Sequence, residues 1–456
     1  MKVRRRQVDR RGFALVAVLW VVIVAGMVLL GAQKATRANL VMSYNELASV
    51  RAHWLARAGV ERALAALEDD SVYDAGADGV IDGWFDDAQL FEEVQLTGGS
   101  FSVMGGGIEW VDPRQGRFGL IDHAGRLNVN HADASALGNL GVLAEWQVNA
   151  ILDWRDADNN VRAGGAEGAW YDQLPYPYLI RNGSLETVAE LRLVRDIDEW
   201  AYVGEDADLD GVLDAGEDDF AATDPPDNGD GELQRGLAGL TTVWSYERNL
   251  DAAGNKRTNV NTADKDKLKE TFNLTDGLAE AITQHKSGKS SKAPGGKSSK
   301  AQRFNSLMEL MDVRPKRKAS DDEKNKIDKI DLKWLAGHLD ELTLTDDERL
   351  PARINVNTAP ADVLATLPKM DPRTAERIIQ QRMMPAGRFE SVGGLFLNKV
   401  LDERQFKAMA ERITVRSNVF EIRSRGVTTW GVRKQIVAVV DRGTKPVTIL
   451  HWYQSE

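Results

Sequence analysis

Acidic side chains recur at alternate positions in the segment 206–217, which reads Asp-Ala-Asp-Leu-Asp-Gly-Val-Leu-Asp-Ala-Gly-Glu. Positions one, three, five, nine and twelve of this segment are Asp206, Asp208, Asp210, Asp214 and Glu217. Calcium binds roughly six to eight oxygen atoms at about 2.3 to 2.6 Å, and these carboxylates could supply them together with the Val212 carbonyl at position seven. The spacing therefore predicts that this segment wraps one calcium ion.

Gly211 occupies position six, where glycine permits the sharp turn that the backbone makes between ligands. With it, the segment has the full pattern of an EF-hand loop. The flank differs from that of an EF-hand, because Pro225 and Pro226 follow the loop and forbid a long exiting helix. We therefore expect a calcium site that stabilises the fold, and not one of a pair of EF-hands that senses calcium. The competing interpretation is a solvated acidic loop that binds no ion.

A second group of carboxylates, Asp156, Asp158 and Glu167, is a weaker candidate for a metal site. The stretch 74–87 is also rich in glycine and aspartate, and we expect it to be a solvated loop. Calcium is thus the only cofactor that the sequence predicts.

Catalytic patterns are absent from the sequence. The six histidines are scattered, and none lies in an H-E-x-x-H pair or a G-x-S-x-G turn. The run Gly296-Lys297-Ser298 resembles the end of a phosphate-binding loop, but Ser291 stands where that motif has its first glycine. We name no catalytic residue and do not expect an enzyme.

The composition sets further limits. With 456 residues, 43% of them hydrophobic, the chain can bury a large core and is expected to divide into two or three domains. The absence of cysteine excludes disulfides and zinc–thiolate sites. A formal net charge of −11 disfavours a general nucleic-acid binder, because phosphate binding depends on clustered lysine and arginine.

The elements that must position these groups begin with a long apolar helix. Residues 13–33 carry no charge, and a helix of roughly 20 such residues can span a bilayer. The basic residues that precede it are Lys2, Arg4, Arg5, Arg6, Arg10 and Arg11. They predict a cytoplasmic amino end. A cleaved secretory signal ending near Leu30-Gly31-Ala32 is the alternative, but the apolar core of such a signal is shorter, about 7 to 15 residues.

No proline or turn cluster ends this helix after Lys34, so we expect it to continue to about Leu67. Between Lys34 and Leu67, the apolar residues fall on one face of the helix and form a stripe. They are Leu40, Tyr44, Leu47, Trp54, Leu55 and Ala58. Short strands are expected at 101–104 and 118–122, separated by Gly105-Gly106-Gly107 and by Asp112-Pro113. Three more, at 419–425, 433–440 and 447–452, predict an antiparallel meander at the carboxyl end.

The middle of the chain contains a repeat, which starts near residues 128, 259 and 355. Its signature is Asn-Val-Asn, at Asn128-Val129-Asn130, Asn259-Val260-Asn261 and Asn355-Val356-Asn357. Each signature opens onto two short helical patterns, and each unit closes with a similar phrase. These phrases begin at Leu185, Phe304 and Phe389. The first two copies carry insertions before the phrase, at 156–184 and at the lysine-rich stretch 286–303.

The amino end resembles that of type IV pilins and pseudopilins, through its basic leader, its Gly12-Phe13 junction and its apolar helix with an amphipathic continuation. In that family a prepilin peptidase cuts after the glycine, which implies that Phe13 becomes the new amino terminus. Most members have glutamate at the fifth mature position, where this chain has Ala17. Among the pseudopilins of type II secretion, the K-type minor subunit lacks that glutamate.

The repeats are similar to the helix-hairpin-helix units of DNA-uptake and DNA-repair proteins. Those units use a glycine-rich hairpin to bring backbone amides close to the phosphates. The third hairpin, 368–372, contains two prolines and the second, 272–275, has no glycine pair. DNA binding is therefore disfavoured, and a membrane-tethered DNA-binding protein of an uptake system remains as the alternative function.

The central segments 151–158, 164–167 and 190–194, with Tyr171, resemble K-type minor pseudopilins more closely. This resemblance implies a minor pseudopilin that caps the tip of the type II secretion pseudopilus and supports protein export across the outer membrane. It implies contacts with other minor pseudopilins and with the prepilin peptidase. It also implies a single pass through the inner membrane, with the carboxy-terminal bulk in the periplasm.

We thus expect an α+β fold in which a long amino-terminal helix packs on an antiparallel meander and a large helical insertion interrupts the chain. The expected divisions are a leader at 1–12, the helix at 13–68, a pilin-like domain at 69–125 and 414–456, and the inserted repeats at 126–413.

Overall fold

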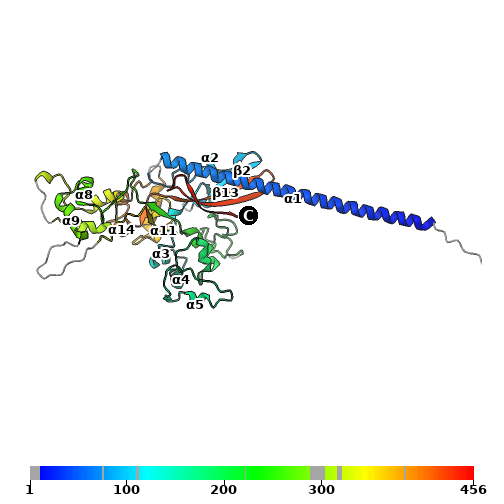
Figure 1. Ribbon diagram of the computed structural model, residues 1–456, viewed down its shortest axis with the longest axis horizontal. Coiled ribbons are helices and arrows are strands. Elements are labelled where there is room, and N and C mark those ends of the chain that lie inside the picture. Colours follow the sequence, from blue (N-terminus) through cyan, green and yellow to red (C-terminus); the bar gives the residue numbers. More distant parts are fainter. Residues whose placement is uncertain are drawn as a thin grey trace, which may run out of the picture.

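The computed structural model describes residues 11–73, 76–108, 112–220, 222–287, 303–315, 321–384 and 387–455. Most of the expected leader and of the lysine-rich stretch lies outside these residues. Helix α1 (Arg11–Tyr73) is continuous over 63 residues, so it begins before and ends after the predicted bounds 13–68. Its amino-terminal half projects from the molecule, and its other half lies on a sheet (Figure 1). It contains an unburied stretch long and apolar enough to cross a membrane.

The sheet is antiparallel and takes its strands from both sides of the insertion. Its order is β1-β2-β13-β14-β15, with β3 paired to β2 and β4 paired to β13. The strands are β1 (Val94–Leu96), β2 (Gly99–Ile108), β3 (Asp112–Phe118), β4 (Ile121–Asp122), β13 (Val419–Thr428), β14 (Arg433–Asp441) and β15 (Thr448–Ser455). The short helix α2 (Ala88–Phe91) precedes β1. The predicted combination of long helix, antiparallel meander and inserted helices is confirmed.

Helix α1 approaches the sheet closely because glycines lie where the two elements cross. A Cβ atom on Gly426 of β13 would lie 2.2 Å from the carbonyl oxygen of Ala52, and one on Gly59 of α1 would lie 2.1 Å from Ser424 Oγ. The core between them contains Ala56, Val60, Ala63, Leu67, Phe101, Val103, Phe420 and Ile422. Burial of this apolar face is the main force that fixes the helix on the sheet.

Two expectations about the amino-terminal strands are wrong. The run Gly105-Gly106-Gly107 does not separate strands but lies inside β2. The pair Asp112-Pro113 begins β3 and is not a turn. Proline is tolerated there because β3 pairs only with β2 and is an edge strand.

The solvated loop expected at 74–87 is also incorrect in part, because Asp78 is only 3% exposed. Its side chain accepts a hydrogen bond of 2.7 Å from the Ser417 amide and pairs with Arg442. Its own amide donates to the Val415 carbonyl at 2.7 Å. This stretch therefore joins the end of α1 to the point where the chain re-enters the sheet.

Each of the three repeats begins and closes with a two-residue strand, and the two strands pair in parallel. The pairs are β5 (Leu127–Asn128) with β6 (Thr241–Thr242), β8 (Thr258–Asn259) with β9 (Leu342–Thr343), and β11 (Ile354–Asn355) with β12 (Ile413–Thr414). The first repeat holds α3 (Ala134–Gly138), α4 (Glu145–Arg155), α5 (Gly168–Tyr171), η2 (Val188–Leu193), α6 (Glu199–Val203) and α7 (Leu237–Leu240). The second holds α8 (Lys265–Phe272), α9 (Asp276–Ser287), η3 (Leu307–Asp312), η4 (Asp321–Glu323), α10 (Leu332–His338) and η5 (Leu339–Glu341). The third holds α11 (Ala361–Ala365), α12 (Pro372–Arg382), α13 (Val392–Leu397) and α14 (Glu403–Met409). A further pair, β7 (Tyr246–Arg248) with β10 (Arg349–Pro351), lies between repeats.

The second asparagine of each signature explains why the closing phrases recur. Asn357 accepts a bond of 2.9 Å from the Phe389 amide and donates one of 3.0 Å to the Phe389 carbonyl. The equivalent pairs are Asn130 with Leu185 and Asn261 with Phe304. The predicted correspondence between signature and closing phrase is thus confirmed in all three copies.

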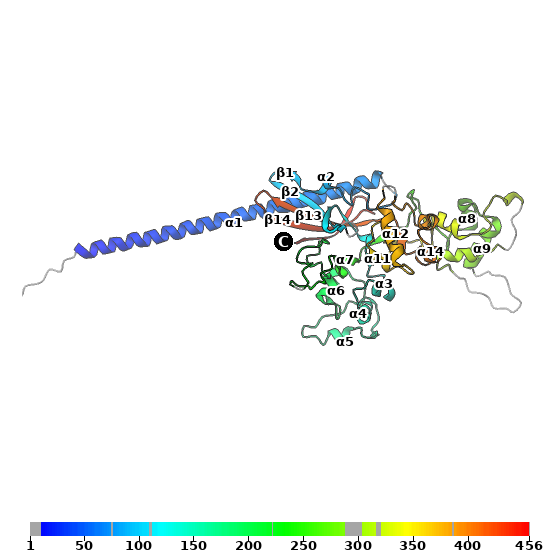
Figure 2. The same ribbon diagram turned by 180° about the vertical axis from the view of Figure 1, so that it is seen from behind.

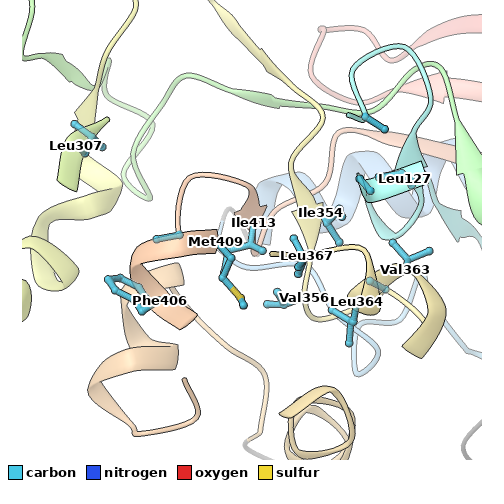
Figure 3. Close-up of a cluster of buried hydrophobic side chains, with 14 of the residues drawn as sticks. Leu127, Leu307, Ile354, Val356, Val363, Leu364, Leu367, Phe406, Met409 and Ile413 are labelled. Atoms are coloured by element: carbon cyan, nitrogen blue, oxygen red, sulfur yellow. The ribbon is translucent and has the colours of Figure 1, made fainter. Parts of the chain in front are cut away.

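The repeats share one hydrophobic core, separate from the core under α1. In the third repeat, Leu364 of α11, Met409 of α14 and Ile413 of β12 gather with Val356, which follows β11, and Leu367, which follows α11 (Figure 3). Leu127 of the first repeat and Leu307 of the second belong to the same cluster (Figure 3). The insertion is therefore one packed body.

Candidate metal sites

The predicted calcium loop lies between α6 and α7 of the first repeat. Oxygen atoms of Asp206, Asp208 and Asp210 lie within 4.8 Å of one another. Asp206 is 2% exposed, so its carboxylate is buried, whereas Asp208 is exposed. The structure therefore gathers the first three predicted ligands around one point.

Backbone amides inside the loop hold these carboxylates in place. The Gly211 amide donates to Asp206 Oδ1 at 3.3 Å, and the Asp210 amide donates to Asp208 Oδ1 at 3.1 Å. The Val212 amide donates to Asp210 Oδ1 at 2.8 Å. Gly211 has a φ of +75°, which is the left-handed conformation that a side chain would oppose. The predicted need for glycine at position six is confirmed.

Glu217 closes the loop, and it is 6% exposed. Its Oε1 accepts from the Ala207 amide at 2.8 Å, and its Oε2 accepts from the Asp214 amide at 3.1 Å. The Asp214 side chain is exposed, and the group of carboxylates within 4.8 Å of one another includes neither Asp214 nor Glu217. Their roles as ligands, and that of the Val212 carbonyl, remain predictions.

Burial raises the pKa values of the carboxyl groups in this loop. It raises the pKa of Asp206 above its ordinary value, that of Asp210 to about 6 and that of Glu217 to about 7. Neighbouring carboxylates add to each rise. A buried carboxylate needs either a proton or a cation, and this set of clustered oxygen donors suits a hard divalent cation.

The loop is docked on the sheet by backbone contacts. The Gly107 amide of β2 donates to the Gly211 carbonyl at 2.7 Å, and the Leu213 amide donates to the Pro113 carbonyl of β3 at 2.8 Å. The Arg423 guanidinium of β13 donates to the Leu209 carbonyl. A Cβ atom on Gly107 would lie 2.4 Å from the Gly211 oxygen. The glycine run in β2 therefore makes room for the loop.

The second candidate also forms a cluster, because oxygen atoms of Asp156, Asp158 and Glu167 lie within 4.8 Å of one another. Glu167 is 3% exposed, and neither of its carboxylate oxygens has a hydrogen-bond partner within the described part of the chain. Burial, with the nearby charge of Asp153 and Asp156, raises the pKa of Glu167 to about 7. A buried carboxylate without donors is the arrangement that a bound cation would complete.

Sequence reasoning missed Asn160 at this second site. Counted from Asp156, it occupies position five and Glu167 occupies position twelve, so the spacing of the first loop recurs with Val161 in place of glycine. The Asn160 amide donates to Asp158 Oδ1 at 2.7 Å, as the equivalent amide does in the first loop. Arg162 donates to Asp156 Oδ2 at 2.5 Å, so its guanidinium occupies one carboxylate oxygen. Counting twelve residues from Asp156 would have identified this loop.

The predicted processing site lies at the start of α1. Gly12 and Phe13 belong to its first turn, and Phe13 is 81% exposed.

The hairpins of the second and third repeats place Asn273 and Lys369 at φ of +51° and +66°, where a helix-hairpin-helix unit has glycine. The glycine that lets such a unit bring its backbone amides close to phosphates is therefore absent from both turns.

Two family models, both described as type II secretion system protein K, match this chain over residues 126–203 and 354–416. These ranges fall on the first and third repeats. A type II secretion system protein K from Pectobacterium carotovorum subsp. carotovorum is 44% identical over 59 residues, which span 13% of this chain and only 18% of that relative. The fold is similar to a chain of the crystallised GspK-GspI-GspJ complex from enterotoxigenic Escherichia coli, with 14% identity, a TM-score of 0.43, and coverage of 92% and 99% of the two chains. In its first and third repeats, this chain is thus similar to protein K of the type II secretion system.

Proposed function

We propose that this chain is a minor pseudopilin at the tip of a type II secretion pseudopilus, where it caps the filament and supports protein export across the outer membrane. The supporting observation is the position of the repeats. The second and third repeats lie beyond the sheet, at the end of the molecule opposite the projecting half of α1, and the first repeat lies to one side of the sheet (Figures 1 and 2). A filament built through α1 would thus carry this bulk above its last subunit, where it obstructs further stacking. The role is structural and needs no catalytic group.

Other minor pseudopilins are the proposed partners, and the exposed stripe of α1 is the proposed contact. Leu47 and Trp54 are 50% and 59% exposed, whereas Leu55 is buried against the sheet. An apolar stripe that its own sheet leaves uncovered suits a neighbouring subunit. Leu40 and Tyr44 extend the stripe towards the membrane-spanning part.

The test of this contact is co-purification with the I- and J-type minor pseudopilins. Leu47→Glu combined with Trp54→Glu is expected to abolish association, because two carboxylates replace exposed apolar area. Deleting residues 286–300 is the matched control and should leave the complex intact. Association that survives the double substitution, or that is lost on the deletion, contradicts the proposed contact.

We further propose that α1 spans the inner membrane once, with the bulk of the chain in the periplasm, after cleavage between Gly12 and Phe13. In cells with a prepilin peptidase, intact-mass measurement should find a chain that starts at Phe13. Gly12→Leu should block processing by steric obstruction, and Gly31→Leu, inside the apolar run, should not. A mature chain that starts at Met1 or Gln33 would contradict this proposal.

We propose calcium in both acidic loops, as a structural ion. The first loop offers Asp206, Asp208, Asp210 and Glu217, and the second offers Asp156, Asp158 and Glu167 with the newly identified Asn160. Buried carboxylates support both sites. In each loop, the ion would neutralise carboxylates that repel one another. Its binding would stabilise the folded conformation of that loop in the first repeat.

Calorimetry of the calcium-depleted chain tests these sites separately. Asp206→Ala with Glu217→Ala should remove one binding event and lower the thermal midpoint in calcium, while Glu167→Gln should remove the other. Asp230→Asn, in an acidic turn outside both patterns, is the control and should leave both events unchanged. A wild-type chain that binds no calcium above background refutes both sites.

A further inference from the structure

A partly open cavity lies between the sheet, the acidic loop 206–217 and the third repeat. Its volume is about 110 Å³. The glycine run 105–107 of β2, the loop segment 209–211 and Thr358 of the third repeat form part of its wall. Arginines from three separate segments complete the wall, namely Arg117, Arg126, Arg235 and Arg423.

Arg117 is the most unusual of these side chains, because it is a buried guanidinium without a carboxylate partner. It is 6% exposed, and no carboxylate in the described part of the chain lies within ion-pair distance of it. It donates to the carbonyl oxygens of Phe85 and Leu120 and lies 3.9 Å from the centre of the Phe85 ring. Burial lowers the pKa of Arg117 to about 9. The charge of Asp86 opposes this shift, as that of Asp122 does to a lesser extent, whereas the charges of Arg235 and Arg423 add to it.

The other charges of the wall do not balance this guanidinium. Arg126 and Arg423 share one carboxylate, that of Glu421. Asp122 also lines the cavity, but its Oδ2 already accepts from the hydroxyls of Ser417 and Thr358, each at 2.6 Å. Within ion-pair distance, these three arginines thus have one carboxylate, that of Glu421, among the described residues.

The calcium loop does not supply the missing partner either. Asp206 and Asp210 line the cavity, but their oxygens converge on those of Asp208. Neither forms an ion pair with Arg117, Arg126 or Arg423 within the described residues. Bound calcium would engage the same carboxylates and withdraw their charge from the cavity.

We propose that this cavity binds one small inorganic oxyanion, of the sulfate or phosphate type. Buried charges in proteins are paired, and guanidinium groups present forked donors that match tetrahedral oxyanions. The cavity has room for a compact ion of a few heavy atoms. The oxyanion would join β3 and β13 of the sheet to the inserted repeats.

The test uses the full chain in detergent, with sulfate as the probe and saturating calcium. Ionic strength is held constant with gluconate, a carboxylate anion without a tetrahedral oxyanion group. The thermal midpoint of the wild type should rise with sulfate and reach a plateau, because binding to one site saturates. Sulfate also stabilises proteins through general exclusion from their surface, and that effect increases without saturation.

Arg117→Met separates the two effects, because methionine keeps the apolar length and removes the charge. This variant should show only the non-saturating rise. Arg114→Met is the matched control on the same strand, since Arg114 is exposed and paired with Asp218, and it should keep the plateau. A plateau of equal height in Arg117→Met, or its absence from the wild type, overturns the proposal.

Equilibrium dialysis of the wild type against labelled sulfate gives a second reading that holds even if Arg117→Met fails to fold. One sulfate bound per chain, displaced by phosphate, supports the site. No bound sulfate, or displacement by gluconate, overturns it. The calcium titration is measured separately, so failure of the calcium proposal and failure of this one are distinguishable.

Discussion

Glu421 is the residue on which the charge balance at the centre of the sheet depends. It accepts from Arg126 at 3.1 Å and pairs with Arg423, and all three side chains are largely buried. Burial alone would raise the pKa of Glu421, but the charges of Arg423 and Arg126 outweigh it and hold the pKa well below its ordinary value. Because the folded pKa is depressed, the stabilisation is present above the unfolded pKa and is lost as pH falls through the folded pKa.

We predict that Glu421→Gln lowers the free energy of unfolding by about 3 to 5 kcal/mol at neutral pH, because two buried guanidiniums lose their counter-charge. The variant should also lose part of the acid-induced destabilisation that the wild type shows. Denaturant titration at several pH values measures both effects. Glu403→Gln is the control, because Glu403 is exposed and its pair with Lys407 contributes at most about 1 kcal/mol. Equal losses in the two variants would contradict the prediction.

At the scale of elements, the glycine run in β2 and the acidic loop form one unit although about a hundred residues separate them. The backbone bond from Gly107 to Gly211 needs an approach that a side chain would prevent. The loop thus fixes part of the first repeat on the pilin-like sheet. The calcium ion that we propose for this loop would stabilise that junction as well as the loop itself.

We predict that Gly107→Ala displaces the loop from the sheet and lowers the stability of the calcium-bound chain by about 1 to 3 kcal/mol, as overpacking does. Calcium affinity should fall as well, because Gly211 lies at position six of the binding pattern. Hydrogen exchange of residues 99–118 and calorimetry measure the two effects. Gly138→Ala is the control, because a Cβ atom there meets nothing within 4 Å. Unchanged exchange in β2 would show that the loop does not depend on this contact.

The elements that could be predicted are those whose sequence pattern lies within one continuous segment of the chain. The periodicity of apolar residues along the sequence identified α1 and the meander. The Asn-Val-Asn signature identified three repeats, and in the structure the short strands of each repeat pair in the same way. The cluster of Asp206, Asp208 and Asp210 could be predicted because these carboxylates are close in sequence. The glycine run was misread, because its partner Gly211 belongs to another segment and no local pattern contains it. Asp78 was misread for the same reason, since its partners Ser417 and Arg442 come from the far end of the chain.

At the scale of the molecule, the chain passes from the sheet into the insertion and back at a single place. Asp122 of β4 lies opposite Phe420 of β13, so the chain leaves and re-enters the sheet on neighbouring strands. Asp122 accepts from Ser417 and from Thr358 and Asn355 of the third repeat, which makes it the polar centre of this attachment. The sheet and α1 have their own core, distinct from that of the repeats. The two bodies should therefore be separable.

We predict that replacing residues 126–413 with a short Gly-Ser linker leaves a folded chain that still assembles but no longer caps. Folding should survive because β4 and β13 remain paired, and assembly should survive because the stripe of α1 is unchanged. Electron microscopy should find longer pseudopili in cells that express this chain than in cells with the wild type, since the bulk above the last subunit is gone. The control replaces only residues 286–300, which removes the lysine-rich stretch and keeps the repeats, and it should give pseudopili of wild-type length. Filaments of wild-type length in both strains, with the shortened chain folded and incorporated, would show that the insertion does not limit growth.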